Sequence, residues 1–304
     1  MSDWSDELII GGHHRSYRCH LPGDDAAPDA LVIALHGRNL SVDEMRLVTH
    51  LDAIADRYDV LVTYPEGHRR SWNDGRGNTP AERDDVDDVR FIQCLIDRLI
   101  DQYGIDPACV GATGLSNGAV MCHRLGLELG DRISVIAPVA GTMPVALAHV
   151  TPPYAVSVLQ VHGTRDRVTP IAGGRAHGLG RVLLALHGVR APAGPILSLK
   201  ETADRWRAID RCADRRTGES LAASALDPTS VERVTWVGGQ GGTEVESWTV
   251  EGGGHTWPGG PPRFGLGLLG RTSSQFDAGD VIVRFMAQHW HSAVSRALHE
   301  GREG

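Results

Sequence analysis

The sequence has no apolar run of the roughly eighteen residues that a membrane-spanning helix requires. Its start, MSDWSDELII, has neither the basic residues nor the apolar stretch of a signal peptide, so we expect a cytoplasmic protein. It also lacks a basic tract, and its formal net charge of −8 gives a nucleic acid or an anionic membrane no electrostatic attraction. We therefore expect neither as a partner, and the sequence leaves the oligomeric state open.

Disulfide and metal motifs are also missing. The five cysteines are odd in number, scattered and without a C-x-x-C pair, which is typical of reduced thiols rather than of a disulfide frame. Although the chain has 15 histidines, it contains no H-E-x-x-H motif and no paired Cys/His spacing of a zinc site. We therefore expect a protein that works without a metal or another cofactor.

What the chain does have is the composition of a globular protein, with 304 residues of which 41% are hydrophobic and 22% charged. Apolar runs of strand length alternate with helical stretches, which predicts an α/β fold with a mainly parallel central sheet and helices on both faces. The expected strands are 8–10, 17–21, 30–35, 60–64, 110–113, 133–139, 155–161, 231–237 and 245–250. The expected helices are 42–58, 86–103, the stretch that follows residue 116, 201–212 and 277–290.

We expect a single domain over residues 1–304, with its core at about 15–292, although the length also allows two small domains. Two segments rich in glycine and proline, 171–200 and 252–275, interrupt the regular pattern. They hold too much glycine for a core and too many apolar residues for plain linkers. We therefore expect both to be loops at the rim of an active site.

The most informative motif is Gly114-Leu115-Ser116-Asn117-Gly118, which lies between an expected strand and an expected helix. In that context G-x-S-x-G forms a sharp nucleophile elbow that exposes the serine hydroxyl at the end of a strand, as in the α/β-hydrolase fold. Because the chain has 37 glycines, the motif also arises easily by chance, and Ser116 as an ordinary turn serine is the alternative. Cys122, farther along the expected helix, is a weaker candidate nucleophile.

The expected strand 30–35 runs directly into His36-Gly37-Arg38. This is where an α/β-hydrolase places one half of its oxyanion hole. A tetrahedral intermediate needs two fixed donors, and we assign them to the backbone N–H groups of Arg38 and Asn117. For His36 we favour a structural role, in which its ring braces the loop.

Two further residues complete a candidate triad in the chain order Ser, Asp, His that α/β-hydrolases use. Asp166 follows the expected strand 155–161 and can fix the tautomer of a catalytic histidine, although an aspartate that closes an Asx-turn is the alternative. His255 follows the last core strand in a glycine-rich loop, from which it can reach both Asp166 and Ser116. Three other aspartates also follow Ser116 in the chain, but none follows a strand: Asp204, Asp210 and Asp227.

Taken together, these segments resemble the polyhydroxybutyrate depolymerase/feruloyl esterase family of α/β-hydrolases over roughly residues 15–292. The segments that carry the resemblance are ALHGRN, YPEG, SWNDG, DDVDDVRFI, IDPACVGATGLSNGAVM, APVAG, HGTRDRVTP and GGGHTWPGG. The resemblance implies Ser116 as nucleophile, Asp166 as acid and His255 as base. It also implies that Trp72 and Asn73 lie near the substrate cleft. Trp257 is a second candidate cleft aromatic, with a packing role as the alternative.

The resemblance implies a serine carboxylic-ester hydrolase that forms an acyl-enzyme. The expected substrates are small or oligomeric esters of the short hydroxyalkanoate or feruloyl type, with acetylated carbohydrates as a variant. A catalytically silent α/β-hydrolase that acts as a binding or interaction protein is the alternative from another class. A peptidase on the same scaffold would need an additional module or an acidic pair for the amine, and the sequence offers neither.

Overall fold

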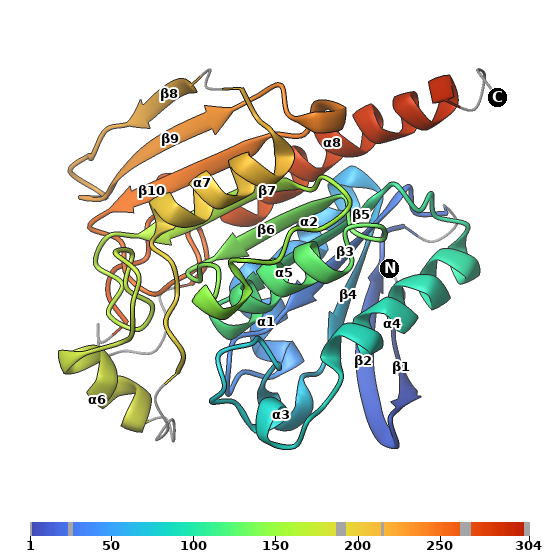
Figure 1. The fold of residues 1–304 in the computed structure, drawn as a ribbon, viewed down its shortest axis with the longest axis horizontal. Coiled ribbons are helices and arrows are strands. Elements are labelled where there is room, and N and C mark those ends of the chain that lie inside the picture. Colours follow the sequence, from blue (N-terminus) through green and yellow to red (C-terminus); the bar gives the residue numbers. More distant parts are fainter. Residues whose placement is uncertain (1, 24–26, 187–192, 214–215, 262–268, 301–304) are drawn as a thin grey trace.

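The computed structural model describes residues 2–23, 27–186, 193–213, 216–261 and 269–300. A single ten-stranded sheet runs through these residues, in the order β1-β2-β4-β3-β5-β6-β7-β10-β9-β8 (Figure 1). The strands are β1 (Ser2–Ile10), β2 (His13–Leu21), β3 (Ala30–Leu35), β4 (Val60–Pro65), β5 (Val110–Leu115), β6 (Val135–Val139), β7 (Ser157–Gly163), β8 (Arg216–Leu221), β9 (Ser230–Trp236) and β10 (Val245–Glu251).

The centre of the sheet is parallel and its two edges are antiparallel. Neighbouring strands from β4 to β10 in the sheet order run parallel. At one edge β1 and β2 form an antiparallel hairpin that pairs with β4, and at the other edge β9 and β8 are added antiparallel to β10. The expected α/β fold is therefore confirmed, with antiparallel edges on a parallel core.

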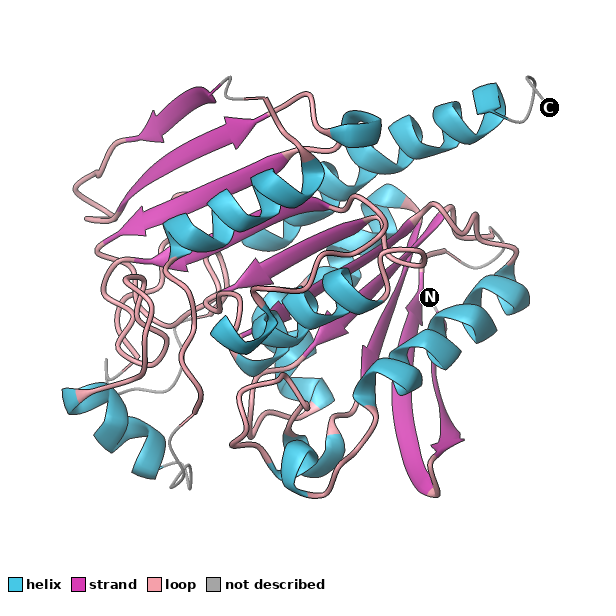
Figure 2. Ribbon diagram, in the orientation of Figure 1, coloured by secondary structure: helices cyan, strands magenta, loops and turns pink. Residues whose placement is uncertain are grey.

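Helices cover both faces of this sheet (Figures 1 and 2). In Figure 1, α4, α5 and α7 lie in front of the sheet, whereas α1, α2 and α8 lie behind it. The α-helices are α1 (Val42–Thr49), α2 (Leu51–Tyr58), α3 (Pro80–Arg83), α4 (Asp88–Tyr103), α5 (Asn117–Glu128), α6 (Gly178–Leu186), α7 (Leu199–Asp210) and α8 (Ala278–Glu300). Three short 3₁₀ helices are η1 (His68–Arg70), η2 (Val145–Leu147) and η3 (Gln240–Gly242).

The central strands are buried on both faces, because helices pack against each side. Every residue of β3, β4, β5, β6 and β7 is buried, and these strands are short apolar runs as the sequence predicts. The carboxyl ends of the parallel strands meet at one edge of the sheet. In a fold of this kind that edge is where a ligand site forms.

The structure differs from the expected elements at four places. The helix expected over 42–58 is two helices, because His50 takes a left-handed conformation (φ 52°) and ends α1 before α2 begins. Strand β8 and helix α3 are additional. The segment 171–200, expected to be a loop, contains helix α6, while its residues 187–192 and residues 262–268 of the other expected loop lie outside the described part.

All five cysteines are free thiols. Burial raises the pKa of Cys109 to about 11 and the pKa of Cys19 to about 12, so both are protonated at neutral pH. No helix in the described ranges is both long and apolar enough to span a bilayer.

Candidate active site

Ser116 lies at the sharp turn between β5 and α5. Its backbone has φ 58° and ψ −113°, a conformation that costs a non-glycine residue about 1–3 kcal/mol. The turn needs glycine on either side, since a Cβ on Gly114 would lie 2.6 Å from the carbonyl carbon of Gly118. A Cβ on Gly118 would lie 2.2 Å from the carbonyl oxygen of Leu35. The elbow therefore packs directly on the end of β3, and it has the strand–turn–helix geometry that the motif predicts.

The imidazole of His255 contacts both Ser116 and Asp166. Its Nε2 is 2.8 Å from Ser116 Oγ, and its Nδ1 is 2.7 Å from Asp166 Oδ2. Because the Asp166 carboxylate can only accept, we assign the ring proton to Nδ1, which donates to Oδ2. The unprotonated Nε2 then accepts a hydrogen bond from the Ser116 hydroxyl. Three side chains from distant parts of the chain thus form one continuous hydrogen-bonded row.

Asp166 divides its two carboxylate oxygens between two tasks. Oδ1 accepts hydrogen bonds from the backbone N–H groups of Val168 and Thr169, each at 2.8 Å, and so closes an Asx-type turn. Oδ2 accepts from His255 and, at 2.8 Å, from the hydroxyl of Thr169. Burial alone would raise the pKa of Asp166, but the interactions with His255, His162 and Thr169 hold it below its ordinary value. The turn role and the contact with His255 are therefore both present.

A pair of histidine–glycine corners holds this site. The first corner, His36–Gly37, directly follows β3, and the second corner, His162–Gly163, forms the end of β7. At the first corner the His36 ring donates from Nδ1 to Gly37 O (2.8 Å) and accepts from the Gly67 N–H at Nε2 (2.9 Å). Burial lowers the pKa of His36 to about 4, so this ring is neutral. The expected bracing role of His36 is confirmed.

The second corner lets the loop that carries His255 pass against the end of β7. A Cβ on Gly163 would lie 2.4 Å from the carbonyl oxygen of Gly253, so only glycine fits there. The backbone N–H of Arg165 donates to Gly253 O at 2.8 Å and holds the two segments together. This close approach brings His255 next to Asp166.

Two residues that line the pocket with Ser116 have a backbone N–H without an acceptor in the described part of the chain. Within the described residues, neither the N–H of Arg38 nor that of Asn117 donates a hydrogen bond, and both residues line the same pocket as Ser116. Asn117 opens α5, where the first N–H groups have no partner inside the helix. A Cβ on Gly37 would lie 3.5 Å from the Ser116 Cβ, so the first corner is next to the serine. This arrangement can accommodate a developing oxyanion.

Trp72 and Asn73 were expected near the substrate cleft, and Trp72 does contact the pocket residue Asn117, but neither is among the described residues that line the pocket. Trp72 is fully buried: its indole N–H donates to His36 O (2.8 Å) and its backbone N–H to the amide oxygen of Asn117 (2.8 Å). The Asn73 side chain is held between Arg124 Nη1 (2.8 Å) and the carbonyl of Val86 (3.0 Å). Because the polar groups of Trp72 and Asn73 already have protein partners, these two residues hold neighbouring parts of the site in place.

The remaining candidates from the sequence are also buried. Trp257 is only 2% exposed and belongs to the hydrophobic core, so the packing alternative holds. Cys122 is fully buried in α5, and burial raises its pKa far above the ordinary value, which excludes it as an exposed thiolate nucleophile. Among the described residues, no group of three or more His, Cys, Asp or Glu side chains is arranged to hold a metal ion.

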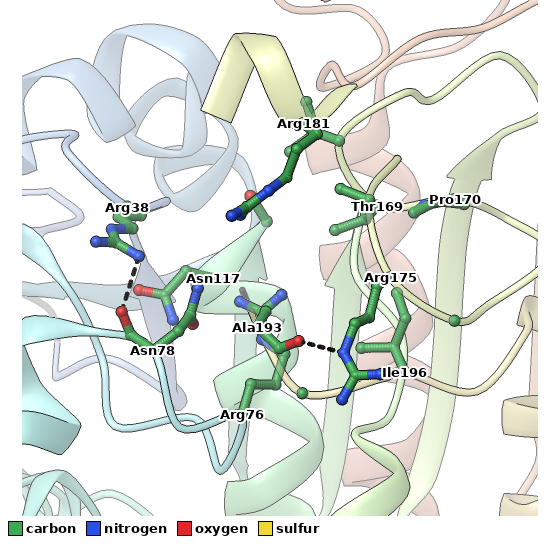
Figure 3. A pocket seen from close by; sticks show the side chains of 15 residues that line it. Arg38, Arg76, Asn78, Asn117, Thr169, Pro170, Arg175, Arg181, Ala193 and Ile196 are labelled. Carbon is green, nitrogen blue, oxygen red and sulfur yellow. Dashed lines mark hydrogen bonds between the residues drawn. The ribbon is translucent and has the colours of Figure 1, made fainter. Parts of the chain in front are cut away.

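The pocket beside Ser116 has a volume of about 680 Å³, its open mouth included. Residues from the segment 171–200 form one wall, so the described part of this segment lies at the rim, as expected. Figure 3 shows four arginines around the hollow: Arg38, Arg76, Arg175 and Arg181. From the sequence, a role was assigned to the backbone N–H of Arg38 but not to its charge, and the other three were not singled out. Arg38 belongs to the ALHGRN segment and Arg76 directly follows SWNDG, whereas Arg175 and Arg181 lie in the segment 171–200, so the fold brings the four together.

Asp74 is a further residue that the sequence reasoning overlooked. Its buried carboxylate accepts from the Asn117 side-chain amide at 2.5 Å and from the guanidinium of Arg76 at 2.5 Å. Since Asn117 follows Ser116 directly, Asp74 and Trp72 together fix the start of α5. The SWNDG motif contains this carboxylate, and its signal was an acidic residue inside an otherwise neutral motif.

Comparison with known proteins gives a consistent family. NocK of Nocardia uniformis subsp. tsuyamanensis, a protein described as an esterase, is 33% identical over 283 residues, covering 92% of this chain and 81% of NocK. A bifunctional acetylxylan esterase/xylanase, XynS20E of Neocallimastix patriciarum, is 26% identical over 52% of this chain, which matches 22% of its length. Feruloyl esterase C of Emericella nidulans is 27% identical over 53% of this chain and 58% of its own. A search of family models gives no match.

A solved structure supports the fold. The acetyl xylan esterase from Aspergillus awamori aligns with 83% of this chain and 94% of its own, with a TM-score of 0.56 and 12% identity. The comparisons agree with the esterase part of the expected resemblance and leave the polyhydroxybutyrate depolymerase part an expectation. Since the match to NocK extends over nearly the whole chain, this protein belongs to the same esterase family.

Proposed function

We propose that this protein is a serine carboxylic-ester hydrolase in which Ser116 is the nucleophile, His255 the general base and Asp166 its acidic partner. The hydrogen-bonded row of 2.8 Å from Ser116 Oγ to His255 Nε2 and 2.7 Å from His255 Nδ1 to Asp166 Oδ2 carries this proposal. A base within hydrogen-bond reach of a hydroxyl, and itself oriented by a third group, is the arrangement that activates a serine.

In the first half of the reaction, Ser116 Oγ attacks the ester carbonyl carbon while its proton passes to His255 Nε2. The carbonyl oxygen becomes an oxyanion, which accepts hydrogen bonds from the N–H groups of Arg38 and Asn117. The buried Asp166 carboxylate stabilises the imidazolium that forms. When the carbon–oxygen bond of the ester breaks, His255 returns the proton to the leaving alcohol and the acyl group stays on Ser116.

In the second half, water takes the place of the alcohol. His255 Nε2 accepts a proton from the water as its oxygen attacks the acyl carbon, and the same two N–H groups hold the second oxyanion. The bond from the acyl carbon to Ser116 Oγ then breaks and the serine regains its proton from His255. The products are a carboxylic acid and free enzyme.

The proposed substrates are small esters of the short hydroxyalkanoate, feruloyl or acetyl-carbohydrate type. The feruloyl and acetylxylan esterases among the relatives support the last two classes. The pocket beside Ser116 is open to solvent, which allows a small ester to reach the serine hydroxyl. Comparing kcat/KM for hydroxybutyrate oligomers, methyl ferulate and acetylated sugars would rank the three classes.

The test of the proposed reaction is the variant Ser116→Ala. We expect it to lose nearly all turnover of a short-chain 4-nitrophenyl ester while its circular dichroism spectrum and melting temperature stay those of a folded protein. Ser220→Ala, at an exposed serine of β8, is the matched control and should keep full activity. Unchanged turnover in Ser116→Ala would contradict the proposal.

A fluorophosphonate probe tests the same site without a choice of substrate. We expect covalent labelling of the wild-type protein, no labelling of Ser116→Ala and strongly reduced labelling of His255→Ala. A catalytically silent binding protein would neither turn over esters nor take the label. That pair of results would replace the hydrolase proposal with the binding-protein alternative.

A further inference from the structure

The pocket beside Ser116 is positively charged although the chain as a whole is negative. Its lining includes four arginines and, within the described residues, no aspartate or glutamate. The formal net charge of the whole chain is −8. Arginines that line a pocket make its electrostatic potential locally positive even in an acidic protein. This potential attracts anions toward the candidate nucleophile.

The charge of one of these arginines is balanced by the protein. Arg76 forms an ion pair with the buried Asp74, whose carboxylate it meets through Nη2 at 2.5 Å and through Nε at 2.9 Å. Asp74 also accepts from the amide of Asn117. The Asp74 carboxylate is therefore engaged, and it is not at ion-pair distance from another pocket arginine among the described residues.

Two other arginines have no such partner. In the described part of the chain, neither Arg38 nor Arg175 has a carboxylate within ion-pair distance; Arg38 Nη1 donates to Asn78 O (3.2 Å) and Arg175 Nε to Ala193 O (2.9 Å). Arg38 Nε is buried without a hydrogen-bond partner among the described residues. Burial and the charges of Arg83 and Arg76 lower the pKa of Arg38, and the carboxylates of Asp74 and Glu82 offset this only in part.

The two guanidinium groups lie on opposite sides of the hollow in Figure 3, with Arg76 and Arg181 between them. Arg38 follows the first corner, and Arg175 belongs to the segment 171–200. The side chains of Val168, Pro170 and Ile196 also line the pocket and supply apolar surface next to the charges. A ligand that fits this lining has a short apolar part and a negative end.

We propose that the pocket binds a carboxylate carried by the ester substrate itself, with the guanidinium groups of Arg38 and Arg175 as its counter-charges. This rests on the proposed hydrolase function and narrows its substrate class to esters with a free carboxylate. Arginine presents a planar fork of N–H donors that matches the two oxygens of a carboxylate. A linear hydroxy-acid oligomer carries such a group at its end, whereas alkyl ferulates and acetylated sugars are neutral.

The test compares each acidic ester with its neutral methylated counterpart. For a carboxylate on the acyl side the pair is mono-4-nitrophenyl adipate and 4-nitrophenyl methyl adipate. For a carboxylate on the alcohol side the pair is 3-acetoxybutanoate and methyl 3-acetoxybutanoate, followed by acetate release. We expect kcat/KM of the wild-type protein to be at least about tenfold higher for the acid in one of the two pairs, and that pair identifies the side that carries the charge.

Arginine variants then test the source of this preference. In Arg38→Gln and Arg175→Gln the acid-to-neutral ratio of kcat/KM should fall toward one, and Arg175→Lys should restore part of it because the charge returns. Arg57→Gln is the charge-matched control, because Arg57 is an exposed arginine paired with Asp280 away from the pocket lining, and it should keep the wild-type ratio. High salt should also reduce the preference, since it screens partly exposed charges.

A wild-type ratio of about one or below in both pairs would overturn the proposal, and so would a preference that survives in both glutamine variants. In either case, hydrolysis of the neutral esters that still depends on Ser116 would leave the proposed function standing. Loss of the hydrolase proposal would look different, because neither member of a pair would then be cleaved in a Ser116-dependent way.

Discussion

The two histidine–glycine corners have the same sequence and the same place at the end of a parallel strand, but they are held differently. At the first corner, both ring nitrogens of His36 have backbone partners. At the second corner, His162 Nδ1 donates to Gly163 O at 3.1 Å, while its buried Nε2 has no partner among the described residues. The hydrogen bonds of the His36 ring are thus complete within the first corner and its neighbouring loop, whereas the second corner adjoins the hydrogen-bonded pair Asp166 and His255.

This difference shows that the same local motif can have different structural roles, which depend on the segments packed against it. The first corner packs against the elbow glycine Gly118, and Arg38, which follows this corner, lines the pocket and has a backbone N–H without an acceptor among the described residues. The second corner packs against Gly253 and so brings a histidine to a carboxylate. The first corner therefore lies next to an uncharged backbone donor, the Arg38 N–H. The second corner lies next to a charged group, the Asp166 carboxylate. Each of the following changes acts on one side of that comparison.

The largest effect is expected at the second corner, from Asp166→Asn. The amide would favour the wrong imidazole tautomer and would not stabilise the imidazolium, so kcat should fall by about 10⁴-fold with the fold retained. Steady-state kinetics on a 4-nitrophenyl ester measures it. Asp210→Asn, at a buried carboxyl outside the site, is the control and should keep its kcat; a similar loss in both variants would show that Asp166 acts through stability alone.

A matched pair of glycine substitutions compares the packing of the two corners. Gly118→Ala would place a Cβ 2.2 Å from Leu35 O at the first corner, and Gly163→Ala would place one 2.4 Å from Gly253 O at the second. Backbone atoms cannot yield as a flexible side chain does, so each should lower the free energy of unfolding by about 3 kcal/mol or more. Urea unfolding measures this, with Gly218→Ala as a control because the nearest atom there is 3.7 Å away.

The two corner histidines should differ in their contribution to stability. His36→Ala removes the acceptor of the buried Gly67 N–H, so we expect a loss of about 2 kcal/mol together with lower activity. His162→Ala removes a ring whose Nε2 has no partner among the described residues, so its loss should be smaller. Melting temperatures of the two variants measured side by side test this order. Equal losses would mean that the second hydrogen bond at the first corner contributes nothing.

The smallest effect concerns a carboxyl at the opposite end of β7. Asp210 Oδ1 accepts from the Val156 N–H at 3.0 Å, but no cation among the described residues forms an ion pair with it, and burial raises its pKa from 3.8 to about 7. The folded protein therefore holds a proton that the unfolded chain releases, so stability falls as pH rises from about 4 to 7. We expect a slope of about 1 kcal/mol per pH unit near pH 5.5 that is absent in Asp210→Asn.

Denaturant unfolding at several pH values measures that slope. Asp166 has the opposite sign: its lowered pKa adds stability above the ordinary carboxyl pKa, and this stability is lost as acid protonates the group. The two ends of β7 therefore show what burial does to a carboxyl with and without the partners of the second corner. A pH slope that is the same in Asp210→Asn and in the wild-type protein would contradict this account.

The parallel strands could be predicted from the sequence because each is a short apolar run that ends at a turn or a glycine. The runs over 30–35 and 110–113 became β3 and β5, the two strands that hold the elbow. The break at His50 could not be predicted, since the apolar period continues through it and only the left-handed conformation of one residue ends the helix. Helix α6 was not predicted, because the glycine and proline content of the surrounding segment indicated a loop in spite of the apolar residues within it. A single domain stays a prediction, supported by the one sheet.

The geometry of the site was predictable where spacing and backbone determine it. Ser116, Asp166 and His255 each follow a strand, and the carboxyl ends of parallel strands meet at one edge. Trp72 lies near the pocket but does not line it, because a motif gives position along the chain but not the direction of a side chain; its indole N–H donates to the His36 carbonyl instead. Two of the pocket arginines, Arg175 and Arg181, depend on how the segment 171–200 folds, and no local pattern encodes that.

The conformation of Ser116 also bears on heat resistance and on laboratory evolution. The turn that exposes its hydroxyl stores backbone strain that every other contact of the elbow must hold in place. A glycine at this position would adopt the same angles freely, so the inactive Ser116→Gly protein should melt at a higher temperature than Ser116→Ala. Selection for thermal stability alone would therefore favour replacement of the reactive serine at this turn. A screen for thermostable variants must assay ester turnover as well.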